Sequence, residues 1–202
     1  AASDVYKRQP CSLNCPAGTD CQGYVGLIAN GQYREAVKLI KEKVPLPASI
    51  GRICPHPCEQ ACRRKMVEDP IAIAHLKSFA ADLDLRSWAP YQPECAPDTH
   101  RKISIVGGGP AGLTAAYFLR TMGHSVAIYD AMPKMGGMLR YGIPQYRLPK
   151  EVLDQEIAAI ANLGVTMINN AKIGDGVTLD ELREGSDAVL VAIGCLLYTS
   201  PS

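Results

Sequence analysis

The sequence predicts an α+β chain of two domains, in which an all-helical, cysteine-bearing domain precedes an α/β domain with a parallel sheet. Three observations predict this division. Six of the eight cysteines fall within the first third of the 202 residues. A proline-rich stretch without periodicity, "APYQPECAPDTHRK", then marks a linker. Beyond it, strand and helix patterns alternate around a glycine-rich turn, as in parallel α/β sheets. We therefore expect domains over 10–90 and 101–194, joined by a linker over 91–100.

The two ends of the chain have no periodicity and no capping pattern of their own. The opening "AASDVYKRQ" and the closing "CLLYTSPS" back-translate into nearly complementary DNA strings. Both strings resemble the mosaic-end adapter of transposase-based sequencing libraries. We therefore interpret residues 1–9 and 195–202 as translated adapter, not as native sequence, and exclude them from fold prediction.

Charge and hydropathy exclude two classes of partner. Without the two ends, 19 Lys and Arg residues face 19 Asp and Glu residues, so nothing favours binding to nucleic acid or to an anionic membrane. No apolar run approaches the roughly 20 residues of a membrane span. Because a nucleotide-binding domain accompanies the cysteines, we expect a reducing cytoplasmic setting and metal ligation in place of disulfides.

Four helices are expected in the first domain. Thr19 and Gln22 form the pattern of a capping box at the start of the first helix, and Asn30-Gly31 ends it. The second helix has apolar residues at helical spacing and stops before Pro45. The expected helices run from about 20 to 30, over 33–43, from Pro55 or Pro57 to about Lys65, and over 71–88.

The spacing of the cysteines indicates a metal centre. Cys58 and Cys62 would share one face of a helix, one turn apart. Cys54 precedes Pro55, which favours extended backbone and leaves its thiolate free to turn toward the same site. Cys11-x3-Cys15-Pro16 resembles the closing half of a ferredoxin-type run, whose earlier Cys-x2-Cys pair would lie upstream of residue 10. Soft thiolate ligands suit iron–sulfur clusters. We therefore predict iron–sulfur ligation by Cys11, Cys15, Cys54, Cys58 and Cys62.

Two alternatives stay open for these cysteines. Zinc has four candidate ligands in Cys54, His56, Cys58 and Cys62, although this spacing only permits a zinc site and does not indicate one. Buried, unliganded cysteine is the other alternative. We expect Cys21, inside the first helix, to belong to the core, and the linker residue Cys95 to have no role.

The stretch "ISIVGGGPAGLTAAYFLRTMGHSVAIYD" has the pattern of strand, turn, helix and strand. Gly107 would make the tight turn, Gly109 would let the backbone approach a pyrophosphate, and Gly112 would allow close packing of helix on strand. The helix N-terminus would then face the phosphates. Asp130 ends the second strand, where a carboxylate can accept from a ribose hydroxyl. The expected elements are strands 103–106, 125–130, 165–168 and 188–194 and helices 111–122 and 151–163, the first of them capped by Gly123.

With these motifs in hand, the chain resembles a known family. It is similar to the small (β) subunit of NAD(P)H-dependent glutamate synthase and to the N-terminal half of dihydropyrimidine dehydrogenase. The resemblance is carried by "CSLNCPAG", "GRICPHPCEQAC", "VGGGPAGLTAAYFL" and "GGMLRYGIPQYRLPKEV", in the family's order. NAD and FAD share the glycine turn, and it is the segment "MPKMGGMLRYGIPQYRLPK" that favours FAD.

The resemblance implies an all-helical, ferredoxin-like iron–sulfur domain with [4Fe–4S] clusters, followed by part of a Rossmann-like FAD-binding domain. Electrons would pass between NAD(P)H, FAD and the clusters, toward a larger catalytic subunit or a fused domain. The NAD(P)H domain would begin after "VLVAIG". By position, Arg147 would lie near flavin and cluster, the alternative being a surface charge. The residues implied to hold FAD are Gly107, Gly109, Pro110, Ala111, Gly112, Leu113, Asp130, Gly136, Gly137 and Met138.

The chain departs from the family pattern in two places. The Cys54–Cys58 spacing is short, and Lys77 stands where a non-cysteine ligand is expected, so the fourth ligand of a Cys15/Cys54/Cys58 cluster is open. Cys11 and Cys62 would bind the other cluster. No general acid or base is expected, because hydride chemistry belongs to the cofactor. The competing hypothesis is a non-enzymatic, zinc-stabilised helical adaptor fused to a nucleotide-binding domain.

Overall fold

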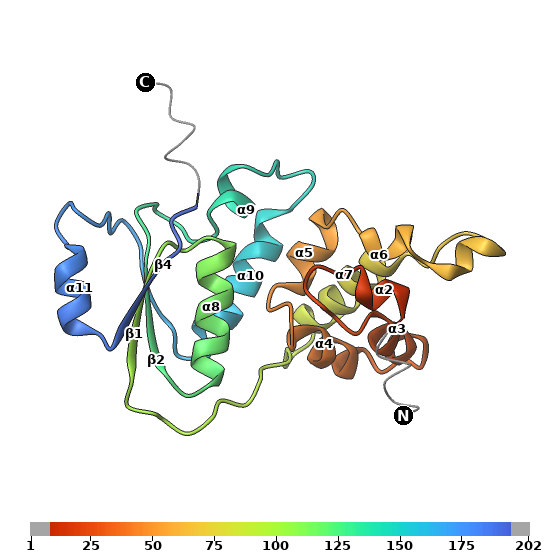
Figure 1. Cartoon of the computed structure of the whole chain (residues 1–202), viewed down its shortest axis with the longest axis horizontal. Coiled ribbons are helices and arrows are strands. Elements are labelled where there is room, and N and C mark those ends of the chain that lie inside the picture. Colours follow the sequence, from red (N-terminus) through yellow and green to blue (C-terminus); the bar gives the residue numbers. More distant parts are fainter. Residues whose placement is uncertain (1–8, 195–202) are drawn as a thin grey trace. The chain divides into compact units, whose positions relative to one another are not determined.

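The computed structural model describes residues 9–194, which divide into two compact units at Tyr91/Gln92 (Figure 1). Residues 91–100, predicted as the linker, contain no helix or strand. The adapter interpretation of 1–9 and 195–202 concerns residues that, apart from Gln9, lie outside the described part.

The first unit is helical, as predicted. Its elements are α2 (Pro10–Leu13), α3 (Cys21–Ala29), α4 (Tyr33–Lys41), α5 (Pro47–Ile53), α6 (Pro57–Gln60), the 3₁₀ helix η1 (Arg63–Met66) and α7 (Ile73–Leu85). Gly31 ends α3 with φ of 73°, in the left-handed region that favours glycine after a helix.

Helices α3, α4 and α7 enclose the core of this unit. Ala36, Val37 and Ile40, spaced as the sequence predicted, are fully buried on α4. They pack in one cluster with residues of α3, α6 and α7, and the partly buried Cys11 and Cys15 lie against it. The cysteine-bearing segments are therefore docked on an apolar core.

The start of α3 differs from the prediction. Asp20, not Thr19, is the N-cap, and its Oδ1 accepts a hydrogen bond of 2.9 Å from the Gly23 backbone N–H. Both residue types are good caps, so the sequence alone did not decide between them. Thr19 is almost completely buried, and its hydroxyl faces sulfur atoms.

The predicted third helix is wrong in its length, and the helices α2 and α5 were missed. The α6 helix ends at Gln60, and Cys62 is extended (φ −66°, ψ 124°), so Cys58 and Cys62 do not share a helix face. Tertiary contacts override helix propensity here, since Cys62 lines a pocket together with Cys11. The missed α5 begins at Pro47, and proline at the first helical position is a start signal.

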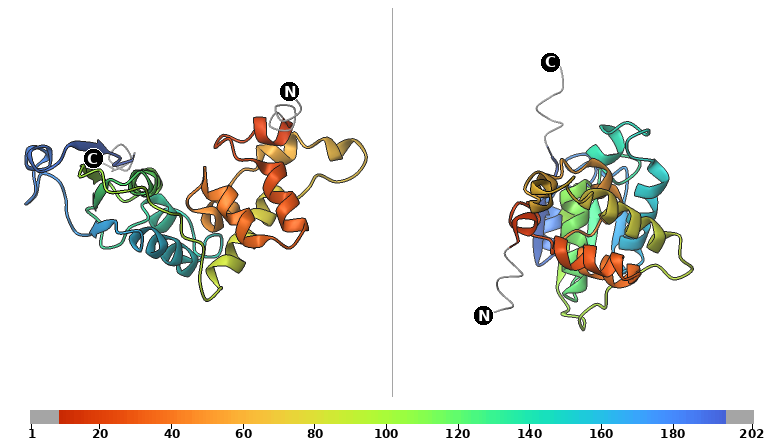
Figure 2. Two further views of the ribbon diagram at one scale, coloured as in Figure 1. Left: turned by 90° about the horizontal axis from the view of Figure 1, so that it is seen from below. Right: turned by 90° about the vertical axis from the view of Figure 1, so that its right-hand side faces the viewer.

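Next to Cys62 the chain leaves the body of its unit. The η1 segment extends away from the other helices of this unit in two views (Figures 1 and 2). Met66 and Val67 are accordingly exposed.

The second unit is built on a parallel four-stranded sheet of order β3-β2-β1-β4. Its elements are β1 (Lys102–Val106), α8 (Pro110–Thr121), β2 (Ser125–Tyr129), α9 (Met138–Tyr141), α10 (Lys150–Ala161), β3 (Thr166–Ile168), α11 (Leu179–Gly185) and β4 (Ala188–Val191). The predicted strands and the two predicted helices are all present, with ends shifted by a few residues.

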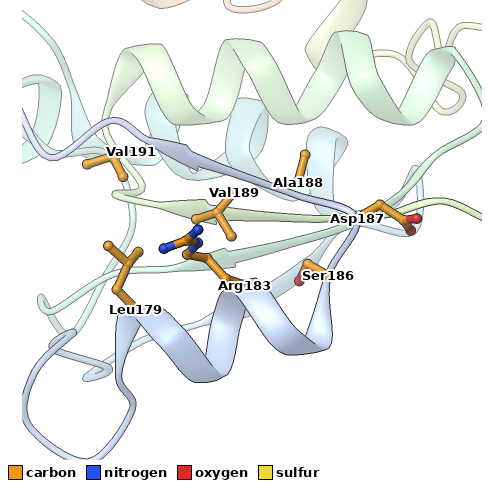
Figure 3. A pocket seen from close by; sticks show the side chains of 7 residues that line it. All are labelled: Leu179, Arg183, Ser186, Asp187, Ala188, Val189 and Val191. Atoms are coloured by element: carbon orange, nitrogen blue, oxygen red, sulfur yellow. The ribbon is translucent and has the colours of Figure 1, made fainter.

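Helices cover both faces of this sheet. In the view of Figure 3, α8 lies on one face and α11 on the other. The α11 helix was not predicted, although Thr178 and Glu181 form a reciprocal capping box at its start. Because the strands are parallel, Gly107, Asp130 and Ala192 follow β1, β2 and β4 at the same edge of the sheet.

Within residues 9–194, none of the helices is long and apolar enough to cross a membrane.

The close packing of α5 on α7 generates a first prediction. A Cβ at Gly51 would lie 2.7 Å from the Ser78 Cβ and 2.8 Å from its backbone nitrogen, so Gly51→Ala must push the two helices apart. We expect a loss of about 1–3 kcal/mol in the free energy of unfolding. Urea unfolding followed by circular dichroism measures it.

Gly26→Ala is the matched control. A Cβ at Gly26, within α3, meets no atom within 4 Å, and alanine favours the helix. A Gly51→Ala protein as stable as Gly26→Ala would contradict the close approach.

Candidate functional site: a cysteine cluster and a glycine-rich turn

The predicted cysteine ligands lie in, or directly after, separate helices of the first unit. Cys11 lies in α2, Cys15 follows it, Cys54 directly follows α5, and Cys58 and Cys62 lie in and just after α6. Cys54 has the predicted extended backbone (ψ 133°). These thiols form no disulfide among the described residues. Cys95 belongs to the second unit, apart from this group.

Cys11 and Cys62 line a pocket of about 250 Å³. Cys21 lines it as well, and the rest of the wall is mixed, with apolar Val25 and Ile73 beside the polar Arg63, Arg64, Gln9 and Gln22. The resemblance assigned Cys11 and Cys62 to one cluster, and the pocket brings these two together. Cys21 is 1% exposed and belongs to the core cluster, as the sequence predicted.

Cys15 has a polar environment of its own. The Thr19 Oγ1 lies 3.0 Å from its Sγ, and the buried Lys77 is close enough for its charge to act on the thiol. Burial raises the pKa of Cys15. Hydrogen bonds from Thr19 and from the Ala17 backbone, together with the Lys77 charge, lower it by more than burial raises it, so the net pKa lies below the usual value. A thiol poised in this way readily becomes a thiolate ligand.

Cys58 shows the opposite effect. Burial raises the pKa of its thiol to about 12, and the charges of Cys21, Cys54, Glu59 and Cys15 add to the increase. Cys58 therefore carries a proton in the metal-free protein, and a metal must displace that proton to bind. The charges of Cys54 and Cys15 act on Cys58, so each of these two thiols lies within electrostatic range of it.

In the described residues, neither the residues weighed as zinc ligands nor the predicted cluster ligands are grouped around one metal ion. Among residues 9–194, no three or more His, Cys, Asp and Glu side chains form a group that could hold a metal ion. His56 instead pairs through its Nδ1 with the Glu59 Oε2, at 3.2 Å. A [4Fe–4S] cluster places its own irons and sulfides between the ligands, so its thiolates surround it and do not converge on one ion. The all-thiol donor set and the pocket at Cys11 and Cys62 fit such a cluster.

Glu59 is a structural residue that the sequence analysis missed. Its Oε1 accepts a hydrogen bond of 2.9 Å from the Ala74 backbone N–H, in the first turn of α7. Glu59 thereby ties the Cys58 segment to the helix that carries Lys77. No sequence signal could have found it, because the two partners are 15 residues apart and belong to different helices.

The glycine-rich turn of the second unit has the predicted form. Gly107 has φ of 111°, and a Cβ there would lie 2.3 Å from the Ala192 carbonyl oxygen. A Cβ at Gly112 would lie 1.9 Å from the Gly107 carbonyl oxygen, so the helix packs on the strand as only glycine allows. Gly109, the N-cap of α8, differs from both. Its φ of −77° suits any residue, and a Cβ would meet only the Gly137 Cα at 3.9 Å.

Asp130 is buried and holds this turn in place. Its Oδ2 accepts a hydrogen bond from the Gly108 backbone N–H, and its Oδ1 accepts one of 2.7 Å from the Met132 N–H. Each carboxylate oxygen has a second lone pair, so acceptance from a ribose hydroxyl stays available. The sequence predicted the position of Asp130 but not this anchoring role.

The segment after Asp130 returns to the glycine turn. The Gly136 N–H donates to the Gly108 carbonyl oxygen at 2.7 Å, and a Cβ at Gly137 would lie 2.7 Å from the Gly109 Cα. The structure thus brings Gly136 and Gly137 beside Gly109 and Pro110, as predicted for one binding site. Met138 begins α9 and is 44% exposed.

Other predicted residues take less constrained positions. Pro110 occupies the first position of α8, with Ala111 exposed beside it, and Leu113 is fully buried under the helix. Arg147 is exposed, which is compatible both with its predicted place near the flavin and with the alternative of a plain surface charge.

A second pocket of about 390 Å³ lies between α11 and β4 (Figure 3). Its walls are residues 179–191, none of which belongs to the predicted site.

Comparison with known proteins identifies both domains. The model for dihydropyrimidine dehydrogenase domain II, 4Fe–4S cluster, matches residues 5–88, and that for an NAD(P)-binding Rossmann-like domain matches residues 105–163. This combination defines the class: a helical 4Fe–4S domain joined to a dinucleotide-binding α/β domain. The resemblance and the fold class predicted from the sequence are confirmed.

Within that class, the chain is similar to several oxidoreductase subunits. It is 40% identical to the NADP(+)-dependent formate dehydrogenase subunit beta of Moorella thermoacetica, over 96% of the chain and 31% of that protein. It is 42% identical to the NADPH-Fe(3+) oxidoreductase subunit beta of Geobacter sulfurreducens, over 92% of the chain and 28% of that protein. For the NAD-dependent dihydropyrimidine dehydrogenase subunit PreT of Salmonella typhimurium the identity is 39%, over 92% of the chain and 45% of that protein.

The chain therefore spans less than half the length of these relatives. A solved structure of the oxidoreductase FprA from Mycobacterium tuberculosis matches 49% of the chain and 23% of its own, at 27% identity and a TM-score of 0.42.

The anchoring of the glycine turn generates a second prediction. Asp130→Ala leaves the buried N–H of Gly108 and that of Met132 without their acceptors, so we expect a loss of about 1–3 kcal/mol in unfolding free energy. Thermal unfolding with and without dinucleotide measures it. Asp175→Ala is the control, because Asp175 is exposed on a loop. Equal stability of the two variants would contradict the anchoring role.

Proposed function

We propose that the chain is the part of an NAD(P)H-dependent oxidoreductase that holds FAD and [4Fe–4S] clusters and passes electrons between them. The observation that carries this proposal is that one chain contains both a thiol-rich 4Fe–4S domain and a glycine-rich turn. Asp130 accepts a hydrogen bond from this turn, and Gly137 packs against it. Flavin when bound accepts a hydride and releases electrons singly, which iron–sulfur clusters can carry onward.

In this proposal the second unit binds FAD at the edge of its sheet. The N-terminus of α8 directs free backbone N–H groups at the pyrophosphate, and Pro110 has no N–H to leave unsatisfied there. Gly109 and Gly137 have no side chains, so the backbone on both sides of the proposed pyrophosphate site is open to a ligand. Asp130 would accept from the ribose, and the fixed charge of Arg147 would stabilise reduced flavin.

The first unit would hold the clusters. Cys15, Cys54 and Cys58 would bind one cluster, and Cys11 and Cys62 would supply two ligands to the other. Electrons would leave toward a larger catalytic subunit or a fused domain, in keeping with the subunit names of the relatives.

The test of the proposal is anaerobic purification followed by measurement of iron, acid-labile sulfide and flavin. We expect broad visible absorbance with all three components present. Protein that carries zinc and no flavin would contradict the proposal and favour the adaptor hypothesis.

Replacement of single cysteines tests the ligand assignment. Cys58→Ser removes a buried ligand, so we expect iron and sulfide to fall by about one cluster per chain. Cys95→Ser is the matched control, with unchanged iron, because Cys95 lies in the other unit. Equal iron in the two variants would refute the assignment of Cys58.

Substitutions at two glycines distinguish an effect on cofactor binding from an effect on folding stability. Gly109→Ala introduces a Cβ that fits the protein but projects where the dinucleotide backbone would approach. We expect unchanged unfolding of the cofactor-free protein and FAD binding at least tenfold weaker, which corresponds to about 1.4 kcal/mol. Gly112→Ala, whose Cβ meets the Gly107 carbonyl, should lose stability and binding together. FAD titration monitored by flavin fluorescence measures the affinity, and unimpaired binding by Gly109→Ala would contradict the site.

A further inference from the structure

Two buried groups near Cys15 have no part in the scheme above. Thr19 is 1% exposed, and its Oγ1 lies 3.0 Å from the Cys15 Sγ and 3.4 Å from the Cys21 Sγ. Lys77, on α7, is 5% exposed, although lysine is rarely buried without a partner.

The direction of the Thr19 hydrogen bond follows from ligand chemistry. A cysteine sulfur that binds iron is a thiolate and has no proton to give, so the Thr19 hydroxyl must donate to Cys15. The thiol of Cys21 can then donate to Thr19, or to the Cys11 carbonyl oxygen 3.7 Å away. Since Thr19 is buried, water does not compete for its hydroxyl.

The Lys77 ammonium is a positive charge on a helix that is tied to a ligand segment. Lys77 lies one turn after Ala74 on α7, and the Ala74 backbone N–H donates at 2.9 Å to the Oε1 of Glu59, the neighbour of Cys58. Across residues 9–194 the Lys77 side chain makes no hydrogen bond and no ion pair of its own. A charged ammonium has three donors and no lone pair, so it can serve as a counter-charge but not as a ligand.

We propose that Thr19 and Lys77 set the reduction potential of the iron–sulfur cluster bound through Cys15 by stabilising its reduced form. This inference rests on the proposed function. Reduction adds one electron, and a hydrogen bond to a ligand sulfur or a nearby positive charge stabilises the added negative charge. Loss of either group should therefore make the cluster harder to reduce.

The experiment is a dithionite titration of the anaerobically purified protein, followed by electron paramagnetic resonance, with iron and sulfide measured in each sample. Thr19→Val removes the hydroxyl at nearly constant volume, and Lys77→Met removes the charge while filling the same space. We expect both variants to keep their iron and to shift the midpoint potential to more negative values. Thr19→Ser and Lys77→Arg should stay close to the wild-type potential.

Lys41→Met is the matched control for Lys77→Met. Lys41 is also 5% exposed and lies in the same unit, but its Nζ donates to the Tyr91 carbonyl oxygen and lies over the Tyr91 ring. We expect this variant to change stability and to leave the potential unchanged.

Four outcomes would overturn the inference. The first is an unchanged potential in Thr19→Val and Lys77→Met with full iron content. The second is conversion of Lys77→Met to a three-iron cluster, which would make Lys77 a ligand. The third is loss of iron from Thr19→Val and Thr19→Ala but not from Thr19→Ser, which would assign Thr19 to assembly. The fourth is an equal shift in Lys41→Met. Wild-type protein without iron would instead refute the proposed function itself.

Discussion

A charged or polar group inside an apolar core needs a partner, and this requirement organises the helical unit. The core of α3, α4 and α7 is mostly apolar, yet it includes the sulfur atoms of Cys21 and Cys58, and Thr19 and Lys77 are buried in the same unit. Burial is the largest of the causes that raise the pKa of Cys58 and of Cys21, so these thiols would stay neutral in the metal-free protein. Under the proposed function a cluster would bind the Cys58 thiolate, Cys21 would stay in the core, and the negative charge of the cluster would be balanced in part by Lys77. Metal binding and stable folding of this unit would then be coupled.

In the second unit, the proposed ligand site is formed by backbone groups and not by side chains. A dinucleotide needs bare peptide groups, and the structure supplies them by bringing Gly109 and Gly137 together at the end of β1. Such a bare turn has few contacts of its own. Asp130 compensates by accepting from Gly108 and Met132, so one carboxylate joins the end of β2 to both loops. The residue predicted to hold ribose is thus also the residue that shapes the turn, and binding and local stability depend on the same side chain.

Patterns set by neighbours in the sequence could be predicted, and those set by distant partners could not. The α8 helix, the strand before Asp130 and the glycine after α8 follow from local periodicity and from the left-handed backbone at Gly123. The end of α6 at Gln60 does not, because the residues from Glu59 to Met66 all permit a helix and nothing local marks the place where Cys62 turns to line a pocket with Cys11. The ligand role of the cysteines remains a prediction from their chemistry and spacing. Glu59 meets its partner Ala74 on another helix, so no spacing could indicate what it contacts.

The adjacent pair Thr19 and Asp20 shows how one local ambiguity bears on the site. Either residue can cap a helix, and the structure gives that work to Asp20, whose carboxylate stays in solvent. The buried position then falls to Thr19, which can donate to sulfur as a carboxylate cannot. With the two residues exchanged, an ionised carboxylate would lie against the Cys15 thiolate, where two like charges in a weakly polar setting repel strongly. If Cys15 binds a cluster as proposed, the charge of that ligand favours this order of the two residues, while the helix itself accepts either order.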